Sequence, residues 1–185
     1  MTADHEPLGR LEPADGRSRL VFRRTVDCLP ADVFAAVTQP DGLASWFPTT
    51  IEGVLDPGAP LRFSFRNAEG EPFSGDVVAF EPSRRWSIHW GDDLLDLAAS
   101  PQGTATVLDF RVEFSPVGRA ARDAAGWHVC LDLLAAHCAH SPVSWTVPQR
   151  WREVHPQYVA RFGPQAATIG VPEHRADRDA FEDPR

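Results

Sequence analysis

The chain has 185 residues, of which 43% are apolar, and it carries a formal net charge of −8. A chain of this length and composition can bury one sizeable core, so we expect a single domain with tails. The acidic balance excludes nucleic acid and anionic membranes as expected partners, because phosphate groups are bound by clustered positive charge.

The sequence shows no export signal and no membrane-spanning segment. No apolar run approaches the roughly 20 residues that cross a bilayer, and the N-terminal segment lacks the apolar stretch of a secretion signal. Cys28, Cys130 and Cys138 have no framework spacing, which indicates free thiols in a reducing compartment. All 18 basic residues are arginine, which is typical of a GC-rich bacterial genome. We therefore expect a cytoplasmic bacterial protein without disulfide bonds or membrane insertion.

Both ends of the chain are polar, contain proline and show no periodicity. We expect residues 1–17 and 163–185 to be mobile tails. The residues between them contain no repeat and no low-complexity linker, so 18–162 should form one domain with a core over 18–140 and an added helix over 145–162.

The body begins with the strand SRLVFRRTVD. Its alternation places Leu20, Phe22 and Val26 on the apolar side, and it places Arg24 there too. LPADVFAAVTQ follows as a short helix in which Pro30 suits the first turn, and PDGLASWFP predicts a second one.

Strands and turns make up most of residues 50–114. LRFSFRN, GDVVAFEP, RWSIHW and GTATVLDFRVEF alternate apolar and polar residues, and the short turns between them predict an antiparallel meander with one buried face. GDDLLD between two of these strands is typical of a hairpin turn with solvated charge. The period then changes to that of a helix over 117–140, with Trp127, Leu131 and Leu134 on one stripe. The pattern over 145–162 is again helical, and we expect Pro156 to kink or divide it.

The segment GWHVCLDLLAAHCAH holds residue types that bind metals, at spacings that do not suit a site. Cys130 and His137 point in similar directions, but seven residues separate them by roughly 10 Å along the axis. His128 faces away from that flank and Cys138 lies in the apolar stripe, which leaves His137 and His140 without an evident third ligand. We expect no metal here, and we expect the histidines to form the solvent-facing edge of the helix.

Several segments in this order resemble a known family. PADVFAAVTQPDGLASWF, GDVVAFEPSRRWSIHW, GTATVLDF and GWHVCLDLLAAH are similar to bacterial members of the START-like (SRPBCC, helix-grip) superfamily related to the activator of Hsp90 ATPase (AHSA1-like). The resemblance covers about residues 18–140 and is weaker beyond them. It implies an α+β helix-grip fold, in which a curved antiparallel sheet of about six to seven strands wraps around a long C-terminal helix, with two short helices after the first strand.

The resemblance also implies a cavity between sheet and helix that takes hydrophobic small molecules. Mapped onto this sequence, the expected lining residues are Trp46, Phe63, Phe65, Trp86, Ile88, Trp90, Leu108, Phe110, Trp127, Leu131 and Leu134. Ordinary core packing is the alternative at each of these positions.

Polar residues on the inward side add candidates for ligand contact. Arg24 needs either a buried anionic partner or a ligand anion there, unless its strand lies near an opening where the side chain reaches solvent. Thr106 could offer a hydroxyl group to a ligand, although threonine is also an ordinary strand residue. His89 alternates onto the solvent-facing side, so we assign it no catalytic role beside Asp92, Asp93 and Asp96.

These observations favour a non-enzymatic protein that binds a hydrophobic or aromatic small molecule. The sequence holds no known catalytic motif, and we expect no cofactor and no metal. Two alternatives stay open: an enzyme of the polyketide cyclase or aromatase type, and a protein-interaction module with a chaperone partner, which only the family name implies. A homodimer is also compatible with the sequence.

Overall fold

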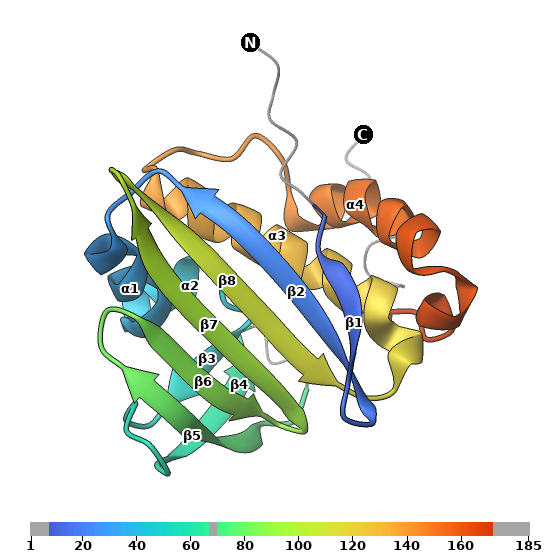
Figure 1. The fold of residues 1–185 in the computed structure, drawn as a ribbon, viewed down its shortest axis with the longest axis horizontal. Helices are drawn as coiled ribbons and strands as arrows, with labels where there is room; N and C mark the ends of the chain where they lie inside the picture. The colour runs from blue at the N-terminus through green and yellow to red at the C-terminus, as the bar shows by residue number, and fades with distance from the viewer. Residues whose placement is uncertain (1–7, 67–69, 172–185) are drawn as a thin grey trace.

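A computed structural model describes residues 8–66 and 70–171 of the chain. Eight antiparallel strands form one curved sheet in the order β1-β2-β8-β7-β6-β5-β4-β3 (Figure 1). The strands are β1 Arg10–Ala14, β2 Arg17–Val26, β3 Thr49–Glu52, β4 Pro60–Phe65, β5 Phe73–Glu81, β6 Arg85–Trp90, β7 Asp93–Gln102 and β8 Ala105–Phe114. The predicted α+β class and antiparallel meander are confirmed.

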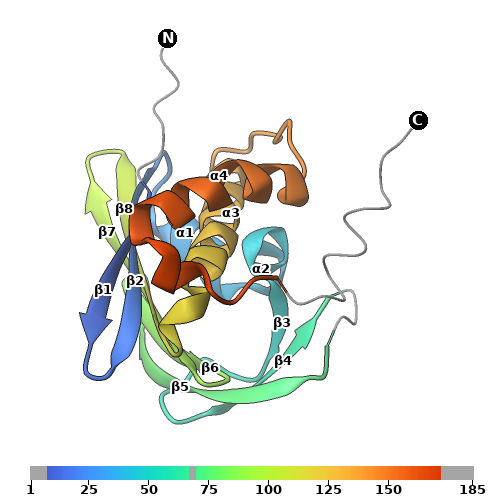
Figure 2. The same ribbon diagram turned by 90° about the vertical axis from the view of Figure 1, so that its right-hand side faces the viewer.

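The sheet bends around one long helix. Helices α1 (Pro30–Thr38) and α2 (Pro40–Trp46) follow β2, α3 (Ala120–Cys138) follows β8, and α4 (Val147–Phe162) completes the set. Figure 2 shows α3 inside the curve of the sheet, with α4 packed over α3 on the side nearer to β1 and β2. The predicted helix-grip arrangement, with two short helices after β2, is therefore confirmed.

The buried face of the sheet follows the alternation seen in the sequence. Leu20 and Phe22 of β2 are buried opposite Val112 and Phe110 of β8. Arg24 continues the same phase and lies on the inner face, as its position in the strand predicts. One hydrophobic cluster joins this face to α1, α2, α3 and α4.

Strand β7 was not predicted, because its aspartates suggest a turn. Asp96 is buried, and its carboxylate accepts hydrogen bonds from Arg85 of β6 at 2.6 Å and from Arg111 of β8 at 3.2 Å. Neighbouring strands thus neutralise a carboxylate on the outer face of the sheet. Leu95 and Leu97 point the other way, into the core.

The two expected tails are partly wrong. β1 lies inside the predicted N-terminal tail and pairs with β2, because Arg10–Ala14 adds a strand to an otherwise free sheet edge. At the other end, a short 3-10 helix over Pro164–Ala167 buries Ala166, and the Ile169 N–H donates to the Gly118 carbonyl at 2.9 Å. Residues 1–7 and 172–185 lie outside the described residues.

Helix α4 continues through Pro156, so the expected division into two pieces is wrong. Pro156 is exposed, whereas the residues that hold α4 to the body, Val154 and Tyr158, are buried. The proline therefore removes one solvent-side backbone hydrogen bond without disturbing that contact. Thr146 and Gln149 close a capping box at the start of the helix. Within the described residues, no helix is both long and apolar enough to cross a membrane.

Candidate functional site

Aromatic side chains meet where α3 faces the inner side of the sheet. Trp127 of α3 lies within 5.1 Å of the Phe110 ring of β8 and within 5.6 Å of the Trp90 ring of β6, measured between ring centroids. Both contacts are close to edge-on, which is a favourable geometry for aromatic pairs. The structure thus brings together three of the predicted lining residues.

The cluster reaches the surface at β4, β5 and β6. Trp90 contacts Phe73 at 5.2 Å and Phe65 at 6.4 Å, and all three side chains are partly exposed. Phe63, buried beneath them, stacks on Phe73 at 5.2 Å. We call Phe65, Phe73 and Trp90 the aromatic rim. A continuous path of rings therefore runs from solvent to α3.

Phe47 occupies the centre of the cluster. It is the first residue after α2, and its buried ring lies 5.2 Å from that of Trp46, 6.5 Å from Trp86, 6.4 Å from Trp90 and 5.8 Å from Trp127. Sequence periodicity does not identify it, because it stands between a helix and a strand and before Pro48, where the backbone is extended. Phe73, the first residue of β5, is missed for a similar reason.

Arg66 holds the backbone around Phe47. Its guanidinium donates to the carbonyl oxygens of Leu43 at 3.0 Å, Phe47 at 3.3 Å and Thr49 at 3.3 Å. Arginine suits this position because its planar fork can donate to several carbonyl groups at once, here at the end of α2 and the start of β3.

The buried indole groups differ in their hydrogen bonds. Trp46 Nε1 donates to the Ala36 carbonyl at 3.1 Å, and Trp90 Nε1 donates to Thr49 Oγ1 at 3.3 Å. Trp86 Nε1 is shielded from solvent and has no hydrogen-bond partner among the described residues.

The predicted lining residues do not all share one environment. Phe65 and Trp90 are partly exposed, and the rest are buried. Thr106 lies away from the aromatic cluster, where its hydroxyl donates to the Cys28 carbonyl at 2.7 Å. The aliphatic members of the predicted set, Ile88, Leu108, Leu131 and Leu134, belong to the same buried cluster as these rings.

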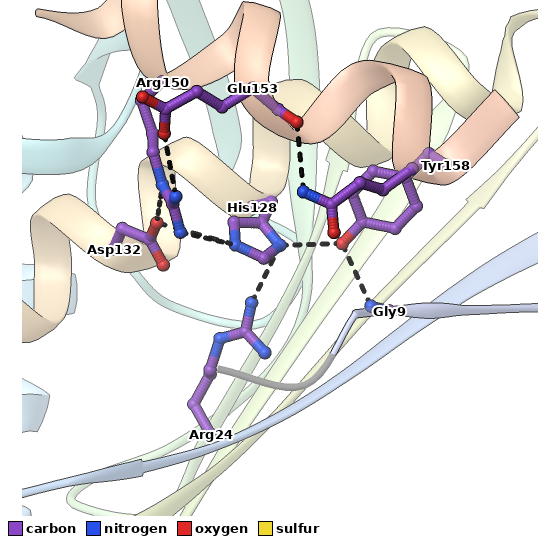
Figure 3. A network of polar contacts seen from close by, with 8 residues as sticks. Gly9, Arg24, His128, Asp132, Arg150, Glu153 and Tyr158 are labelled. Atoms are coloured by element: carbon purple, nitrogen blue, oxygen red, sulfur yellow. Dashed lines mark hydrogen bonds and ion pairs between the residues drawn. The ribbon is translucent and has the colours of Figure 1, made fainter. Parts of the chain in front are cut away.

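A buried polar network lies between β2, α3 and α4 (Figure 3). His128 Nδ1 lies 3.1 Å from Arg24 Nη2 and 2.8 Å from Tyr158 Oη, and that hydroxyl accepts from the Gly9 N–H at 3.0 Å. Because a guanidinium can only donate, Nδ1 is the accepting nitrogen of the imidazole. Burial raises the pKa of Tyr158 to about 12, so its hydroxyl stays protonated and can donate to Nδ1.

The other side of His128 faces a carboxylate. Asp132 Oδ2 lies 3.5 Å from Nε2 and accepts from Arg150 Nε at 2.8 Å. Burial raises the pKa of Asp132, and Arg150 opposes that effect. Nε2 also lies 3.4 Å from Arg150 Nη2, so it faces both the carboxylate and the guanidinium that pairs with it (Figure 3).

Two sequence interpretations fail at this network. His128 is only 1% exposed, not part of a solvent-facing edge, because α4 covers that side of α3 and brings Tyr158 to it. Arg24 is only 3% exposed, so it does not reach solvent through an opening. Both side chains are buried because α4 packs over α3. The periodicity of α3 or of β2 alone does not predict that packing.

His89 lies on the outer face of the sheet, with Nδ1 3.0 Å from Asp76 Oδ1 of β5. The three aspartates that follow it bind elsewhere. Asp93 pairs with Arg119, Asp96 pairs with Arg85 and Arg111, and the Asp92 carbonyl accepts from Arg17 at 2.5 Å. Burial raises the pKa of Asp93, and Arg119 counteracts the shift.

The cysteines and histidines of α3 form no metal site. Within residues 8–66 and 70–171, no group of three or more histidine, cysteine or acidic side chains is placed to hold an ion. His137 and His140 are exposed at the end of α3. Burial raises the pKa of Cys138 to about 12 and also raises that of Cys28, so both are thiols at neutral pH.

The family model described as Activator of Hsp90 ATPase homolog 1-like protein matches residues 27–139, which is more than half of the chain. The chain belongs to this family. The match runs from the end of β2 to the end of α3, so it contains Phe47, the aromatic rim and Trp127. Gly9, Arg24 and Tyr158 lie outside it, and the His128 network therefore joins the family domain to flanking segments.

Several solved structures share the fold of this AHSA1-like chain. A conserved protein of unknown function from Enterococcus faecalis has a TM-score of 0.67 and 15% identity, over 83% of this chain and 91% of that one. CalU16 from Micromonospora echinospora has a TM-score of 0.65 and 25% identity, over 83% and 93%. DynU16 has a TM-score of 0.57 and 24% identity, over 68% and 47%. A search of curated protein sequences finds no match.

Proposed function

We propose that this AHSA1-like protein binds a hydrophobic or aromatic small molecule between the curved sheet and α3. The observation that carries the proposal is the continuous path of rings from the partly exposed rim, Phe65, Phe73 and Trp90, to Phe47 and Trp127. Small-molecule sites are lined mainly by aromatic and apolar side chains with a few placed polar groups. Partly exposed aromatic residues that lie together are typical of binding surfaces.

A protein of the same fold and the architecture around these rings also support a small-molecule ligand. DynU16 is described as a putative protein in the dynemicin biosynthetic locus, so one protein of this fold is associated with the synthesis of a small molecule. The helix-grip architecture places one amphipathic helix against a concave sheet, and a ligand held there would contact both elements at once (Figure 2).

The alternative functions have less support. A cyclase or aromatase would need polar groups directed at the substrate, but Arg24 contacts His128 and Thr106 contacts the Cys28 carbonyl, away from the aromatic cluster. A chaperone-binding role, implied by the family description, would need a contiguous apolar patch. The large apolar side chains that are exposed in the described residues come from separate loops and elements: Leu29, Val54, Val78, Val117, Val143, Val147 and Ile169.

Fluorescence titration with the neutral dye N-phenyl-1-naphthylamine tests the proposal. We expect saturable one-to-one binding that weakens at least about tenfold in Trp90→Leu, because the indole supplies a large part of the apolar contact. Trp151→Leu is the matched control, since Trp151 stacks on His155 of α4, outside the aromatic cluster. Absence of saturable binding in the unmodified protein, or equal weakening in the two variants, would contradict the proposal.

A further inference from the structure

Trp86 carries a hydrogen-bond donor that the described structure does not use. The side chain is 2% exposed, and its Nε1 has no partner among the described residues, whereas Trp46 and Trp90 each donate to an acceptor. Buried donors in folded proteins are nearly always paired, and leaving one unpaired costs about 1–3 kcal/mol. A group that supplied an acceptor at this position would therefore be bound with favourable free energy.

The ring of Phe47 contacts both Trp86 and the rim residue Trp90. Its centroid lies 6.5 Å from that of Trp86, 6.4 Å from that of Trp90 and 5.8 Å from that of Trp127. No residue of the rim is in ring contact with Trp86 among the described residues. The ring contacts therefore connect the rim to Trp86 through Phe47.

Phe47 stands at the junction between α2 and β3. It ends α2 and precedes β3, and its backbone is held there by the Arg66 side chain, which extends from the end of β4. Residues at the ends of elements are the ones that absorb backbone rotation when a segment moves. Movement of the Phe47 ring thus requires no break within a helix or strand.

We propose that the ligand is a planar aromatic molecule with a carbonyl or ether oxygen, whose ring displaces that of Phe47 and whose oxygen accepts a hydrogen bond from Trp86 Nε1. This inference rests on the proposed function and specifies its ligand. Ligands of the same shape gain equally from apolar contact in place of the Phe47 ring, so the new hydrogen bond decides which of them is preferred. Phe47 acts as the specificity-determining residue that keeps the site closed to molecules without a displacing ring.

Two ligands of almost the same shape separate the hydrogen bond from hydrophobic contact. 2-Acetylnaphthalene has a carbonyl oxygen where 2-isopropenylnaphthalene has a methylene group. We expect the unmodified protein to bind the ketone about tenfold more tightly by isothermal titration calorimetry, which corresponds to about 1.4 kcal/mol. In ¹⁵N-edited spectra, the indole N–H signal of Trp86 should move downfield with the ketone and not with the alkene.

Variants at two tryptophans locate the donor. Trp86→Phe should reduce the preference for the ketone to less than about twofold, whereas Trp90→Phe should weaken both ligands in the same proportion, because the Trp90 N–H is already paired with Thr49. If Trp86→Phe fails to fold, 3-benzothienylalanine at position 86 keeps the bicyclic shape without the N–H and serves the same purpose. Phe47→Ala should increase the association rate of both ligands at least about tenfold by removing the displaced ring.

The outcomes distinguish this inference from the proposed function. Binding of neither ligand overturns both. Binding of both ligands with equal affinity, with no shift of the Trp86 signal, overturns the acceptor while the aromatic site stands. An unchanged association rate in Phe47→Ala overturns the displacement of Phe47.

Discussion

Tyr158→Phe should destabilise the protein because it removes one buried hydroxyl group. That hydroxyl accepts from the buried Gly9 N–H at 3.0 Å and contacts His128 Nδ1 at 2.8 Å, while the ring packs on Phe22 and Phe162. Phenylalanine keeps the ring contacts, so the change isolates the polar ones. A net hydrogen bond contributes about 0.5–1.5 kcal/mol, and an unpaired buried amide costs about 1–3 kcal/mol. We therefore expect a loss of about 2–4 kcal/mol in the free energy of unfolding.

Urea denaturation, followed by circular dichroism, measures this loss directly. For a chain of this length, the same change lowers Tm by roughly 5–15 °C. Thr50→Val removes one exposed hydroxyl, which donates to the Ser64 carbonyl at 3.3 Å, and it should change stability by less than about 0.5 kcal/mol. If Tyr158→Phe is equally mild, the network does not hold α4 and Gly9 to α3, and the reasoning is refuted.

Three further predictions concern pH, helix packing and the outer face. The pKa of Tyr158 is raised from 10.0 to about 12 in the folded protein, so its stabilising effect is complete below pH 10 and is lost as the pH rises toward 12. The stability difference between the unmodified protein and Tyr158→Phe should therefore shrink by on the order of 2 kcal/mol over that range, and a constant difference in urea titrations would contradict it. Gly126→Ala should stabilise α3 by up to about 1 kcal/mol in urea, because a Cβ there meets no atom within 4 Å, and a destabilised variant would show that the helix needs the glycine. His89→Ala, which removes a half-exposed contact to Asp76, should change Tm by less than about 2 °C and leave dye binding intact, and lost dye binding would place His89 in the site.

Local periodicity was sufficient for much of the sheet and for α3. Phe22 and Phe110 alternate with polar residues, and Trp127 lies on a helical stripe, so the faces that meet in the core could be predicted from the sequence. β7 could not, because Asp96 resembles a turn residue until the flanking strands supply Arg85 and Arg111. Predicting β7 requires knowing which strands pair with it, and local sequence does not give that.

The residues of the candidate site also fall into those that local periodicity predicts and those that it does not. Trp90 and Trp127 follow from periodicity and from the family resemblance. Phe47 does not, because a residue at a junction has no period, and His128 appears solvent-facing until α4 docks and brings Tyr158 beside it. Sequence patterns thus identify the layers of the fold, whereas the contacts between segments decide which polar and aromatic side chains meet.

We propose that the rings between the sheet and α3 form a ligand site. A crystal structure of the protein with bound 2-acetylnaphthalene tests it most directly. We predict electron density for the naphthalene ring between Trp90 and Trp127, with the Phe47 side chain moved aside and the ketone oxygen within hydrogen-bonding distance of Trp86 Nε1. Density for the ligand only on the outer surface or between α3 and α4, with Phe47 unmoved, would contradict the claim.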